Sequence, residues 1–199
     1  MPTDIKKYKD PFIHFEQWYQ EAQNHKGIKE VNAISLATST NDGCVSNRMV
    51  LLKHYSNRGF VFYTNLNSRK GSQIKQNPHA GMCLYWEPLG RQIRIEGKLE
   101  SVSDEEADAY FATRDIQSRV GAWASKQSQI LESKSKLITR IAKYTVSATT
   151  QNIERPDFWS GFRLVPNYIE FWERGNFRIH NRKLYTLKDG KWESNMLYP

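Results

Sequence analysis

Three side chains that could bind an anion are spaced two residues apart near the C-terminus. The segment FWERGNFRIHNRKLY, residues 171–185, is typical of a strand, a turn at Gly175–Asn176 and a second strand. Side chains two positions apart point to the same face of a strand, so the spacing predicts that Arg178, His180 and Arg182 share one surface. Either water screens these repelling charges or an anion binds to them, and the segment alone leaves both interpretations open.

A second basic pair falls where a helix should begin. In TNLNSRKGSQIKQNP, the pattern predicts a helix that begins near Ser68 and ends before Pro78. Arg69 and Lys70 would occupy its first turn, where the partial positive charge of the helix disfavours cations. A docked phosphate would make the arrangement favourable, because free backbone N–H groups and two cations would converge on it. The alternative is an ordinary exposed basic pair.

A third group, in AYFATRDIQSRVGAWASKQS, combines two hydroxyls with a guanidinium. If the preceding helix continues through this segment, Tyr110, Arg114 and Ser118 lie at i, i+4 and i+8 on one face. Such a face could clamp a phosphate, or it could simply be solvated. Asp115 and the residues after it could break the helix, in which case this alignment would not form.

Two apolar strands also carry cations. Arg48 and Lys53 stand at the two ends of RMVLLK, an odd number of residues apart. Their side chains should therefore lie on opposite faces of the strand, so that one points inward if the other points outward. A cation that faces a barrel interior or an interface needs a partner. In RQIRIEG, Gln92, Arg94 and Glu96 share one face, and the simplest interpretation pairs Arg94 with Glu96 at the surface.

The helices that position these groups can be predicted from caps and periodicity. One helix is expected over residues 10–27, capped by Asp10 and stopped by Gly27, with its regularly spaced aromatic residues in the core. A second should begin at the S-x-x-E capping box of Ser103 and Glu106. A third is expected over residues 128–145.

The remaining pattern predicts about seven strands, mostly antiparallel because the turns between them are short. NDG and KDGK are the clearest turn signals. Strands as apolar as MVLLK and FVFY suit a sheet that is closed on itself or covered by a partner. The expected fold is therefore mainly β with helices (α+β), a small closed or split barrel with flanking helices, in a single domain over residues 1–199. Residues 1–9 form a short N-terminal arm that could be flexible.

Composition narrows the classes of partner. The 199 residues carry 29 basic and 21 acidic side chains, a net charge of +8, which favours anionic partners such as phosphates and keeps nucleic acid under consideration. Cys44 and Cys83 fit no metal or redox spacing and are expected to be free thiols in a reducing compartment. No apolar run has the length of a signal peptide or membrane span, so we expect a cytoplasmic protein with no membrane partner. Walker, Rossmann, nucleophile-elbow and metal-ligand patterns are missing from the sequence, so no metal site is expected.

Six stretches and the ending MLYP, considered together, resemble the pyridoxamine 5′-phosphate oxidase family. The similarity runs from about residue 10 to residue 199, and the number, order and spacing of the stretches make it specific. They are RMVLLKHY, GFVFYTNLNSRKGSQI, NPHAGMCLYWEPLGRQIRIEG, YFATRDIQSRVGAWASKQS, RPDFWSGFRL, IEFWERGNFRIHNRKLY and MLYP.

The resemblance implies a fold, a cofactor and a reaction. The fold would be an FMN-binding split β-barrel of Greek-key type that works as a homodimer, with each FMN at the interface and lined by both subunits. The reaction would be the oxidation of pyridoxamine 5′-phosphate and pyridoxine 5′-phosphate to pyridoxal 5′-phosphate, with O₂ as oxidant and hydrogen peroxide as product. This is a step in vitamin B6 cofactor biosynthesis and salvage.

The resemblance also implies site residues. Those for FMN are Arg48, Met49, Val50, Leu51, Leu52, Lys53, Tyr63, Thr64, Arg69, Lys70, Gln92, Gln127, Ser128, Trp172 and Arg182. Those for the substrate are Lys53, Tyr110, Arg114, Ser118, Arg178 and His180. Arg178 would orient the reacting carbon, and His180 would handle a proton or a hydrogen bond. Two phosphorylated ligands would then supply the counter-charge for the basic C-terminal segment.

The sequence departs from the family pattern in three places. Asn181 stands where the family usually has Asp, and Ser160 stands where Gly is usual. The arm before Asp10 is short and contains Lys rather than Arg, so the sequence leaves open whether it forms a lid or binds product. The preference between the alcohol and the amine substrate, and the subunit that supplies each residue, are also left open.

Three other functions remain alternatives at this stage. The chain could be a related split-barrel flavoprotein with another substrate. Such proteins would lack the combination of the Tyr110, Arg114 and Ser118 set with the Arg178 and His180 pair. It could be a non-catalytic carrier of FMN or pyridoxal phosphate, which the Asn181 departure keeps open. A nucleic-acid-binding module would show salt-dependent binding and retain no chromophore, and we expect no nucleic acid partner.

Overall fold

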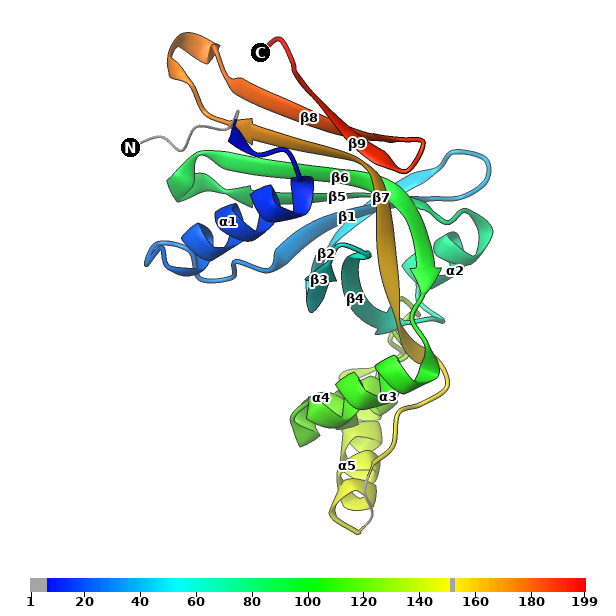
Figure 1. The fold of residues 1–199 in the computed structure, drawn as a ribbon. Coiled ribbons are helices and arrows are strands. Elements are labelled where there is room, and N and C mark those ends of the chain that lie inside the picture. The colour runs from blue at the N-terminus through cyan, green and yellow to red at the C-terminus, as the bar shows by residue number, and fades with distance from the viewer. Residues whose placement is uncertain (1–6, 151–152) are drawn as a thin grey trace.

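The computed structural model describes residues 7–150 and 153–199, and within these residues nine antiparallel strands form one strongly curled sheet (Figure 1). The strand order is β2-β1-β5-β6-β7-β4-β3, and β8 and β9 extend the sheet from β7. The strands are β1 (Ala33–Ser39), β2 (Val45–Leu51), β3 (His54–Ser56), β4 (Gly59–Asn65), β5 (His79–Trp86), β6 (Arg91–Ser101), β7 (Trp159–Glu173), β8 (Asn181–Lys188) and β9 (Lys191–Met196). This half-barrel confirms the predicted mainly β fold with flanking helices.

The helices gather at two places around the sheet. Helix α1 covers the core side of the sheet, and α3, α4 and α5 project together from one end of it (Figure 1). The helices are α1 (Pro11–Gln23), α2 (Arg69–Gln76), α3 (Asp104–Thr113), α4 (Ile116–Ala124) and α5 (Lys134–Thr150). No helix in the described parts of the chain is long and apolar enough to cross a membrane.

Most of the hairpins follow the predicted turns. β1 and β2 pair in register from Ala33–Leu51 to Ser39–Val45 around the NDG turn. β8 and β9 pair around KDGK, where Asp189 and Gly190 both adopt positive φ values of 47° and 74°, as a tight hairpin requires.

The chain around RMVLLK, which was predicted to be one strand, forms two strands, β2 and β3. This is one reason why the sheet has more strands than expected. The chain leaves its β1 partner after Leu52, whose N–H donates to Asn32 O at 2.8 Å. The next residue, Lys53, donates its N–H to Val61 O at 2.9 Å and so joins β4. The resulting bend between β2 and β3 exposes the Lys53 side chain.

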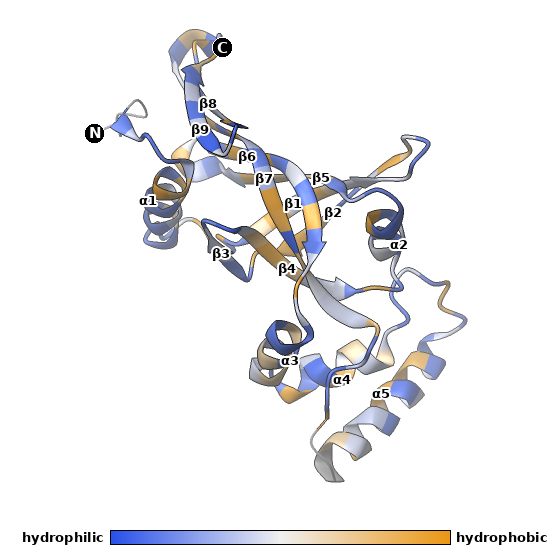
Figure 2. Ribbon diagram, turned by 45° about the vertical axis from the view of Figure 1, so that its right-hand side comes forward, coloured by the Kyte–Doolittle hydropathy of each residue, from blue (hydrophilic) through white to orange (hydrophobic). Residues whose placement is uncertain are grey.

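One apolar core lies between α1 and the inner face of the sheet. Phe15 and Trp18 of α1 are fully buried with Phe171 of β7 and Tyr185 of β8. The apolar colouring follows the strands of this sheet, while hydrophilic residues dominate the outer turns of the helices (Figure 2). The core position predicted for the helix aromatics is confirmed.

The ends of α1 and its neighbouring segment differ in part from expectation. Asp10 caps the helix as predicted, accepting from Phe12 N at 2.7 Å. The helix ends at Gln23 rather than near Gly27, because Asn24 already closes the last turn with a bond to Gln20 O. Residues 1–6 of the predicted N-terminal arm lie outside the described residues, and Tyr8 is buried, with its carbonyl accepting from Tyr185 OH at 3.0 Å.

The capping of α3 and the start of α5 differ from the predictions. Ser103 caps α3 through Glu106 N at 3.2 Å, but the Glu106 carboxylate pairs with Arg163 at 2.8 Å instead of completing a capping box. The third predicted helix begins at Lys134 rather than at residue 128, because the chain first forms an irregular loop in which Ser128 has a φ of 71°.

The C-terminal basic segment is not the strand that its spacing predicted. Residues Asn176–Arg178 form a single 3-10 turn, and β8 begins only at Asn181. Phe177 and Arg178 both have left-handed backbones, with φ of 54° and 64°, which breaks the alternation of a strand. Arg178, His180 and Arg182 therefore do not share one strand face.

Candidate active site

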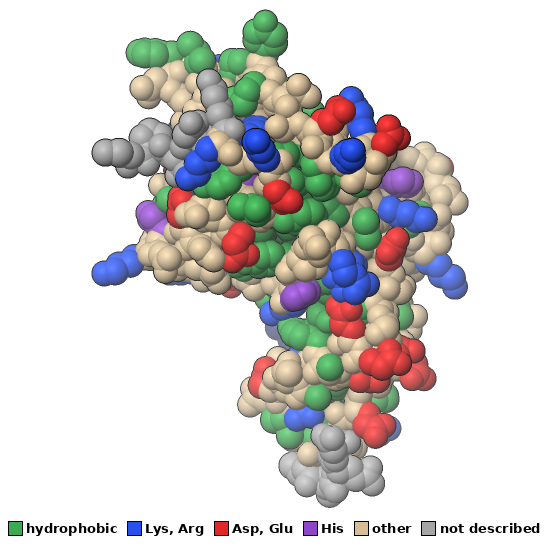
Figure 3. All heavy atoms as spheres, in the orientation of Figure 1, with side chains coloured by type: hydrophobic (Ala, Val, Ile, Leu, Met, Phe, Trp, Pro, Cys, Tyr) green, Lys and Arg blue, Asp and Glu red, His purple; other side chains and the backbone are tan. Residues whose placement is uncertain are grey.

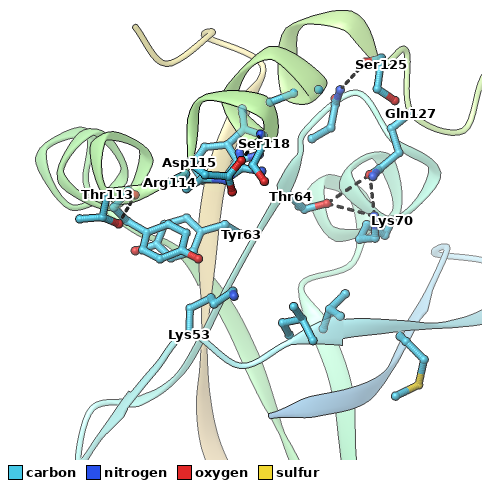
Figure 4. Close-up of a pocket in the computed structure, with 18 residues that line it drawn as sticks. Lys53, Tyr63, Thr64, Lys70, Thr113, Arg114, Asp115, Ser118, Ser125 and Gln127 are labelled. Carbon is cyan, nitrogen blue, oxygen red and sulfur yellow. Dashed lines mark hydrogen bonds between the residues drawn. The ribbon is translucent and has the colours of Figure 1, made fainter. Parts of the chain in front are cut away.

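The main pocket, of about 690 Å³, lies where the end of β2 and the strand β4 meet α2, α3 and α4 (Figure 4). Eleven residues that the resemblance assigned to ligands line it: Met49, Val50, Leu51, Lys53, Tyr63, Thr64, Lys70, Tyr110, Arg114, Ser118 and Gln127. Seven others that the sequence did not single out as ligand-binding also line it: Asn65, Thr113, Asp115, Gly121, Ala122, Ser125 and Trp159.

Helix α2 brings a buried cation to one end of this pocket. Ser68 caps the helix as predicted and accepts from Gly71 N at 3.3 Å, which places Lys70 in the first turn. The Lys70 ammonium donates to Thr64 Oγ1 at 3.0 Å and to Gln127 Oε1 at 2.8 Å (Figure 4). Burial, together with the charge of Arg48, lowers the pKa of Lys70 from 10.5 to about 8.

Two arginines add to the positive charge around this helix end. Arg48 is half-buried and donates to four neutral acceptors, Ser46 Oγ, Leu36 O at 2.9 Å, Thr38 Oγ1 at 2.7 Å and Gln73 Oε1 at 3.3 Å. Its pKa is lowered by burial and by the charge of the exposed Arg69. These interactions give Arg48 the partners that its position required, but they leave its charge uncompensated.

The pKa shifts show that the three cations at the start of α2 repel one another in sequence, Arg69 with Arg48 and Arg48 with Lys70. Arg48 acts on Lys70, and Arg69 acts on Arg48, in each case by destabilising the charged form. A cluster of cations with neutral acceptors is costly unless an anion binds beside it. The predicted anion site at this helix N-terminus therefore fits the geometry, although Arg48 and Arg69 do not themselves line the main pocket.

A stack of parallel aromatic rings forms another wall of the pocket. The rings of Tyr63, Tyr110 and Trp159 are nearly parallel, with the Tyr63 centroid 4.0 Å from that of Tyr110 and 5.3 Å from that of Trp159, and with the Tyr110 and Trp159 centroids 6.2 Å apart. Burial raises the pKa of Tyr63 to about 12, so its hydroxyl stays protonated at neutral pH. The stack fixes the Tyr110 ring beside the cationic groups from α3 and α4.

Arg114 carries an unsatisfied donor beside this wall. Its guanidinium lies 4.8 Å from the centroid of Trp159 and 5.5 Å from that of Phe111, both within cation–π range. Its Nη1 is buried and has no hydrogen-bond partner within the part of the chain that the structure describes. A buried N–H group of this kind normally has an acceptor, so the position fits an anionic ligand.

The helix breaks at Asp115, one of the two possibilities that the sequence left open, so Tyr110, Arg114 and Ser118 do not share one helix face, yet all three line the pocket. Arg114 has an extended backbone and ends α3. Asp115 then caps α4 by accepting from Ser118 N at 2.8 Å. The kink, rather than a shared helix face, turns Arg114 and Ser118 toward the same space as Lys53 (Figure 4).

A second cluster of predicted ligand residues lies elsewhere, on the outer face of the sheet. Gln92 of β6, Trp172 of β7 and Arg182 of β8 are direct neighbours in one row across the three strands. The His180 ring packs on Trp172 with centroids 4.6 Å apart. We call these four residues the strand cluster.

The backbone fixes the tautomer of the neutral His180 ring. Gly175 N donates to His180 Nδ1 at 3.2 Å, so Nδ1 must be unprotonated and the proton of the neutral ring is on Nε2. Arg178, just before it, is exposed in its left-handed conformation. Strained backbone of this kind is common at ligand sites.

The two groups of residues lie at opposite ends of β7. Trp159 opens the strand at the main pocket, and Trp172 lies 13 residues further along, a path of roughly 40 Å at ~3.3 Å per residue. One small ligand cannot reach both groups in the same chain. The resemblance-derived residues that do not line the main pocket are Arg48, Leu52, Arg69, Gln92, Ser128, Trp172, Arg178, His180 and Arg182.

Comparison with protein families identifies the chain. The family model described as pyridoxamine 5′-phosphate oxidase matches residues 21–147, and a model described as the pyridoxine 5′-phosphate oxidase C-terminal dimerisation region matches residues 159–199. The chain belongs to the pyridoxamine 5′-phosphate oxidase family. The second model covers Trp172, Arg178, His180 and Arg182. These residues lie at the C-terminal end of β7 and in the segment that follows it, which we call the far end of β7.

Curated relatives in this family are similar over nearly their whole length. A pyridoxine/pyridoxamine 5′-phosphate oxidase of Myxococcus xanthus is 46% identical over 190 residues, covering 96% of this chain and 92% of the relative. One of Brucella canis is 46% identical over 198 residues, covering 98% and 97%.

Solved structures share the same fold. The PhzG protein of Burkholderia lata, crystallised with tetrahydrophenazine-1-carboxylic acid, has a TM-score of 0.93 and 29% identity, covering 100% of this chain and 97% of that one. A pyridoxamine 5′-phosphate oxidase-related FMN-binding protein of Nostoc punctiforme has a TM-score of 0.74 at 20% identity, covering 96% and 100%. Family and fold together point to a flavin cofactor for this chain.

Proposed function

We propose that this chain oxidises pyridoxamine 5′-phosphate and pyridoxine 5′-phosphate to pyridoxal 5′-phosphate, with FMN as cofactor. In the overall reaction the CH₂–NH₂ or CH₂–OH group of the substrate loses two electrons and two protons, with one hydrogen leaving the carbon and one leaving the nitrogen or oxygen. O₂ takes up both and leaves as hydrogen peroxide. The amine substrate passes through an imine, which water hydrolyses to the aldehyde and ammonia. The activity of the curated relatives supports this assignment.

The observation that carries the substrate assignment is the buried, unpaired Nη1 of Arg114. Lys53, Tyr110 and Ser118 line the same pocket, so two cations and two hydroxyls are available to one phosphate. This chemistry fits a phosphate monoester better than an uncharged alcohol or amine. The pocket would thus select the phosphorylated form of each substrate.

The cations at the start of α2 fit the phosphate of FMN. Arg69 and Lys70 lie in the first turn, where free N–H groups also favour an anion, and Arg48 adds a third charge. FMN, when bound, would supply the acceptor for the substrate's two electrons. The chain would bind and orient the two rings against each other, a contribution of position rather than of acid–base chemistry.

We further propose that the active unit is a homodimer in which the far end of β7 completes the partner's main pocket. Arg178 would orient the reacting carbon, and His180 would donate a hydrogen bond from Nε2. Trp172, Gln92 and Arg182 would contact the flavin from the second chain. The match of residues 159–199 to a dimerisation region supports this arrangement. A reducing compartment such as the cytoplasm fits the free Cys44 and Cys83.

The proposal is tested by adding pyridoxamine 5′-phosphate to the FMN-loaded protein without oxygen. We expect the visible flavin absorbance to bleach and to recover when air is admitted, with pyridoxal 5′-phosphate and peroxide formed in equal amounts. FMN binding without bleaching would refute the substrate assignment. A protein that retains no FMN would refute the cofactor assignment as well.

A second candidate function is oxidation of a reduced tricyclic carboxylic acid, favoured by the similarity to the Burkholderia lata structure. Such a ligand carries a carboxylate and no phosphate, so it would not use the full set of groups around Arg114. Bleaching by a tetrahydrophenazine carboxylic acid, with no response to pyridoxamine 5′-phosphate, would favour this alternative.

A further inference from the structure

A buried carboxylate lies directly beneath two arginines on the outer face of the sheet. Glu170 of β7 accepts from Arg182 Nε at 2.8 Å and from Arg182 Nη2 at 3.2 Å, a bidentate pair. The same carboxylate accepts from Arg94 Nη2 at 2.8 Å. The expected surface pair of Arg94 with Glu96 is therefore replaced by an internal one. Tyr168 OH also donates to Glu170, at 3.1 Å.

This arrangement puts the negative charge inside and the positive charges outside. The side chain of Glu170 is 2% exposed, whereas those of Arg182 and Arg94 are 27% and 41% exposed. Burial raises the pKa of Glu170, but hydrogen bonding from Arg182 and the charges of both arginines outweigh it and lower the pKa. The carboxylate stays ionised and carries one negative charge against the two positive charges of the arginines that it contacts.

The position of Glu170 ties it to the strand cluster. Glu170 is two residues before Trp172 on the same face of β7, and Arg94 is two residues after Gln92 on β6. Arg182, the third member of the row, is held on one edge by Glu170 and at Nη1 by Tyr198 O at 3.0 Å. A guanidinium fixed on two sides has lost most of its rotational freedom before any ligand arrives.

We propose that Glu170 is a positioning residue for FMN binding: it holds Arg182 and Arg94 in place on the surface that the strand cluster presents to the flavin. The proposal rests on the proposed function, because it takes Arg182 as a flavin contact. Glu170 itself is too deeply buried to touch the ligand. Without its charge, the two arginines repel each other and Arg182 loses its fixed orientation.

A purely structural role for Glu170 is the competing explanation, and the same strand supplies a matched control. Glu173 is also a buried carboxylate paired with an arginine, Arg91, at 3.2 Å. It lies on the opposite face of β7, toward the core, where Arg91 packs 4.5 Å from the ring centroid of Trp18. Glu173→Gln therefore removes a comparable buried charge without changing the strand cluster.

The test compares the FMN dissociation constants of wild-type, Glu170→Gln and Glu173→Gln apoproteins by flavin fluorescence quenching, with thermal unfolding of each apoprotein alongside. A charge-assisted hydrogen bond corresponds to roughly tenfold or more in affinity, so we expect Glu170→Gln to weaken FMN binding at least about tenfold. Glu173→Gln should lower the unfolding temperature and leave FMN affinity within about twofold.

A double-mutant cycle identifies the residue through which Glu170 acts. Arg182→Lys keeps the charge but loses the bidentate fork, so Glu170→Gln should weaken FMN binding much less in that background than in wild type. Tyr168→Phe removes one hydrogen bond to Glu170 and one from Arg94 without removing a charge, and it provides a milder variant if Glu170→Gln does not fold. Its FMN affinity should fall several-fold, less than in Glu170→Gln, because the carboxylate and its pairs with both arginines remain.

Three results would overturn the inference. Folded Glu170→Gln protein with wild-type FMN affinity would show that the carboxylate only stabilises the sheet. Additive effects of Glu170→Gln and Arg182→Lys would show that Glu170 does not act through Arg182. Wild-type protein that binds no FMN would overturn the proposed function itself and the role of Glu170 with it.

Discussion

Lys70 and Arg114 show at the level of single residues how the main pocket prepares for anions. Each is a cation with a buried nitrogen, and each contacts neutral groups or lacks a partner among the described residues. The free energy of keeping them charged in the absence of ligand is recovered when a phosphate binds. Both residues therefore lead to predictions about ligand-dependent behaviour.

FMN affinity should fall as the pH rises above about 8, the value to which burial and Arg48 lower the pKa of Lys70 in the apoprotein. Above this pH, Lys70 must take up a proton before it can bind the phosphate as an ammonium. The dissociation constant should then rise by up to about tenfold per pH unit. Titration of apoprotein with FMN between pH 7 and pH 9.5 measures this slope, and Lys70→Met should remove it.

The same lowered pKa affects the stability of the apoprotein in the opposite direction. At pH values between about 8, the pKa of Lys70 in the folded chain, and 10.5, its ordinary pKa, Lys70 is mostly protonated in the unfolded chain and mostly deprotonated in the folded chain. Lys70 therefore destabilises the apoprotein fully below pH 8, and this penalty fades as the pH rises. Lys75→Met, at the exposed far end of the same helix, is the control and should retain both pH dependences, because Lys70 is unchanged.

Arg114→Ala should weaken recognition of the substrate phosphate while leaving FMN in place. The loss of one charge-assisted interaction predicts a fall in kcat/KM of about 10- to 100-fold for pyridoxamine 5′-phosphate, mainly through KM. Activity on unphosphorylated pyridoxamine should change little. Arg58→Ala, which removes an exposed arginine from the turn before β4, is the charge-matched control. An equal loss with both substrates would contradict the phosphate role.

At the level of elements, the kink between α3 and α4 positions the substrate groups, and sequence periodicity alone could not determine it. Tyr110, Arg114 and Ser118 fit a continuous helix by spacing, but the Asp115 side chain competes for Ser118 N and starts a new helix. The sequence thus left the geometry open, and the kink is what brings the three residues to one pocket. From the sequence, Asp115 was expected only as a possible helix breaker. An Asp three residues before a free backbone N–H group is also a signal for the N-cap of a new helix.

Asp115→Ala should reduce both stability and substrate affinity. Loss of an N-cap costs about 1 kcal/mol, and the altered start of α4 should displace Arg114 and Ser118 and raise KM. Ser103→Ala removes the equivalent cap from α3, whose first turn lies on an acidic surface away from the pocket (Figure 3). Chemical denaturation and steady-state kinetics of both variants separate the effects. An unchanged KM in folded Asp115→Ala would contradict the positioning role of the cap.

Elements with strong local signals were predicted well, and those shaped by long-range contacts were not. Ser68 capping and the approaching Pro78 determine α2 from sequence, and NDG determines the first hairpin. The segment around Arg178 has the composition of a strand, yet Gly175 approaches Ile179 O so closely that an added Cβ would lie 1.8 Å from it. That close approach belongs to a tight loop, and no alternating pattern reveals it.

At the scale of the whole molecule, residues that the family resemblance assigns to one site are divided between the two ends of a 15-residue strand. The main pocket holds the groups proposed to bind phosphate, and the strand cluster holds the groups proposed to contact the flavin from the partner. On the face of the molecule shown in Figure 3, basic and acidic side chains are interspersed. This mixture favours small anionic ligands over a continuous nucleic-acid surface.

A site shared between two subunits predicts that two impaired variants restore each other when activity is measured at a substrate concentration below the wild-type KM. Arg114→Ala changes the main pocket, and Arg178→Ala changes the far end of β7, so each homodimer should have two damaged sites. In a hybrid dimer, one site carries both changes and the other carries neither. Random exchange makes about half of the dimers hybrid with half of their sites intact, so the mixture should regain about one quarter of wild-type activity.

The mixing experiment also distinguishes where each residue acts. Subunit exchange is verified with one variant carrying a mass tag, and the activity is measured after dilution from mild denaturant. A mixture of Arg114→Ala with Lys53→Ala is the control, because both changes affect the main pocket and no hybrid site is intact. Recovery in this control would show that Lys53 and Arg114 act in different sites. No recovery in the first mixture despite complete exchange would place Arg178 and Arg114 in the same chain's site. Such a result would require the loop after β7 to fold back over a strand of roughly 45 Å, which the paired register of β6, β7 and β8 opposes.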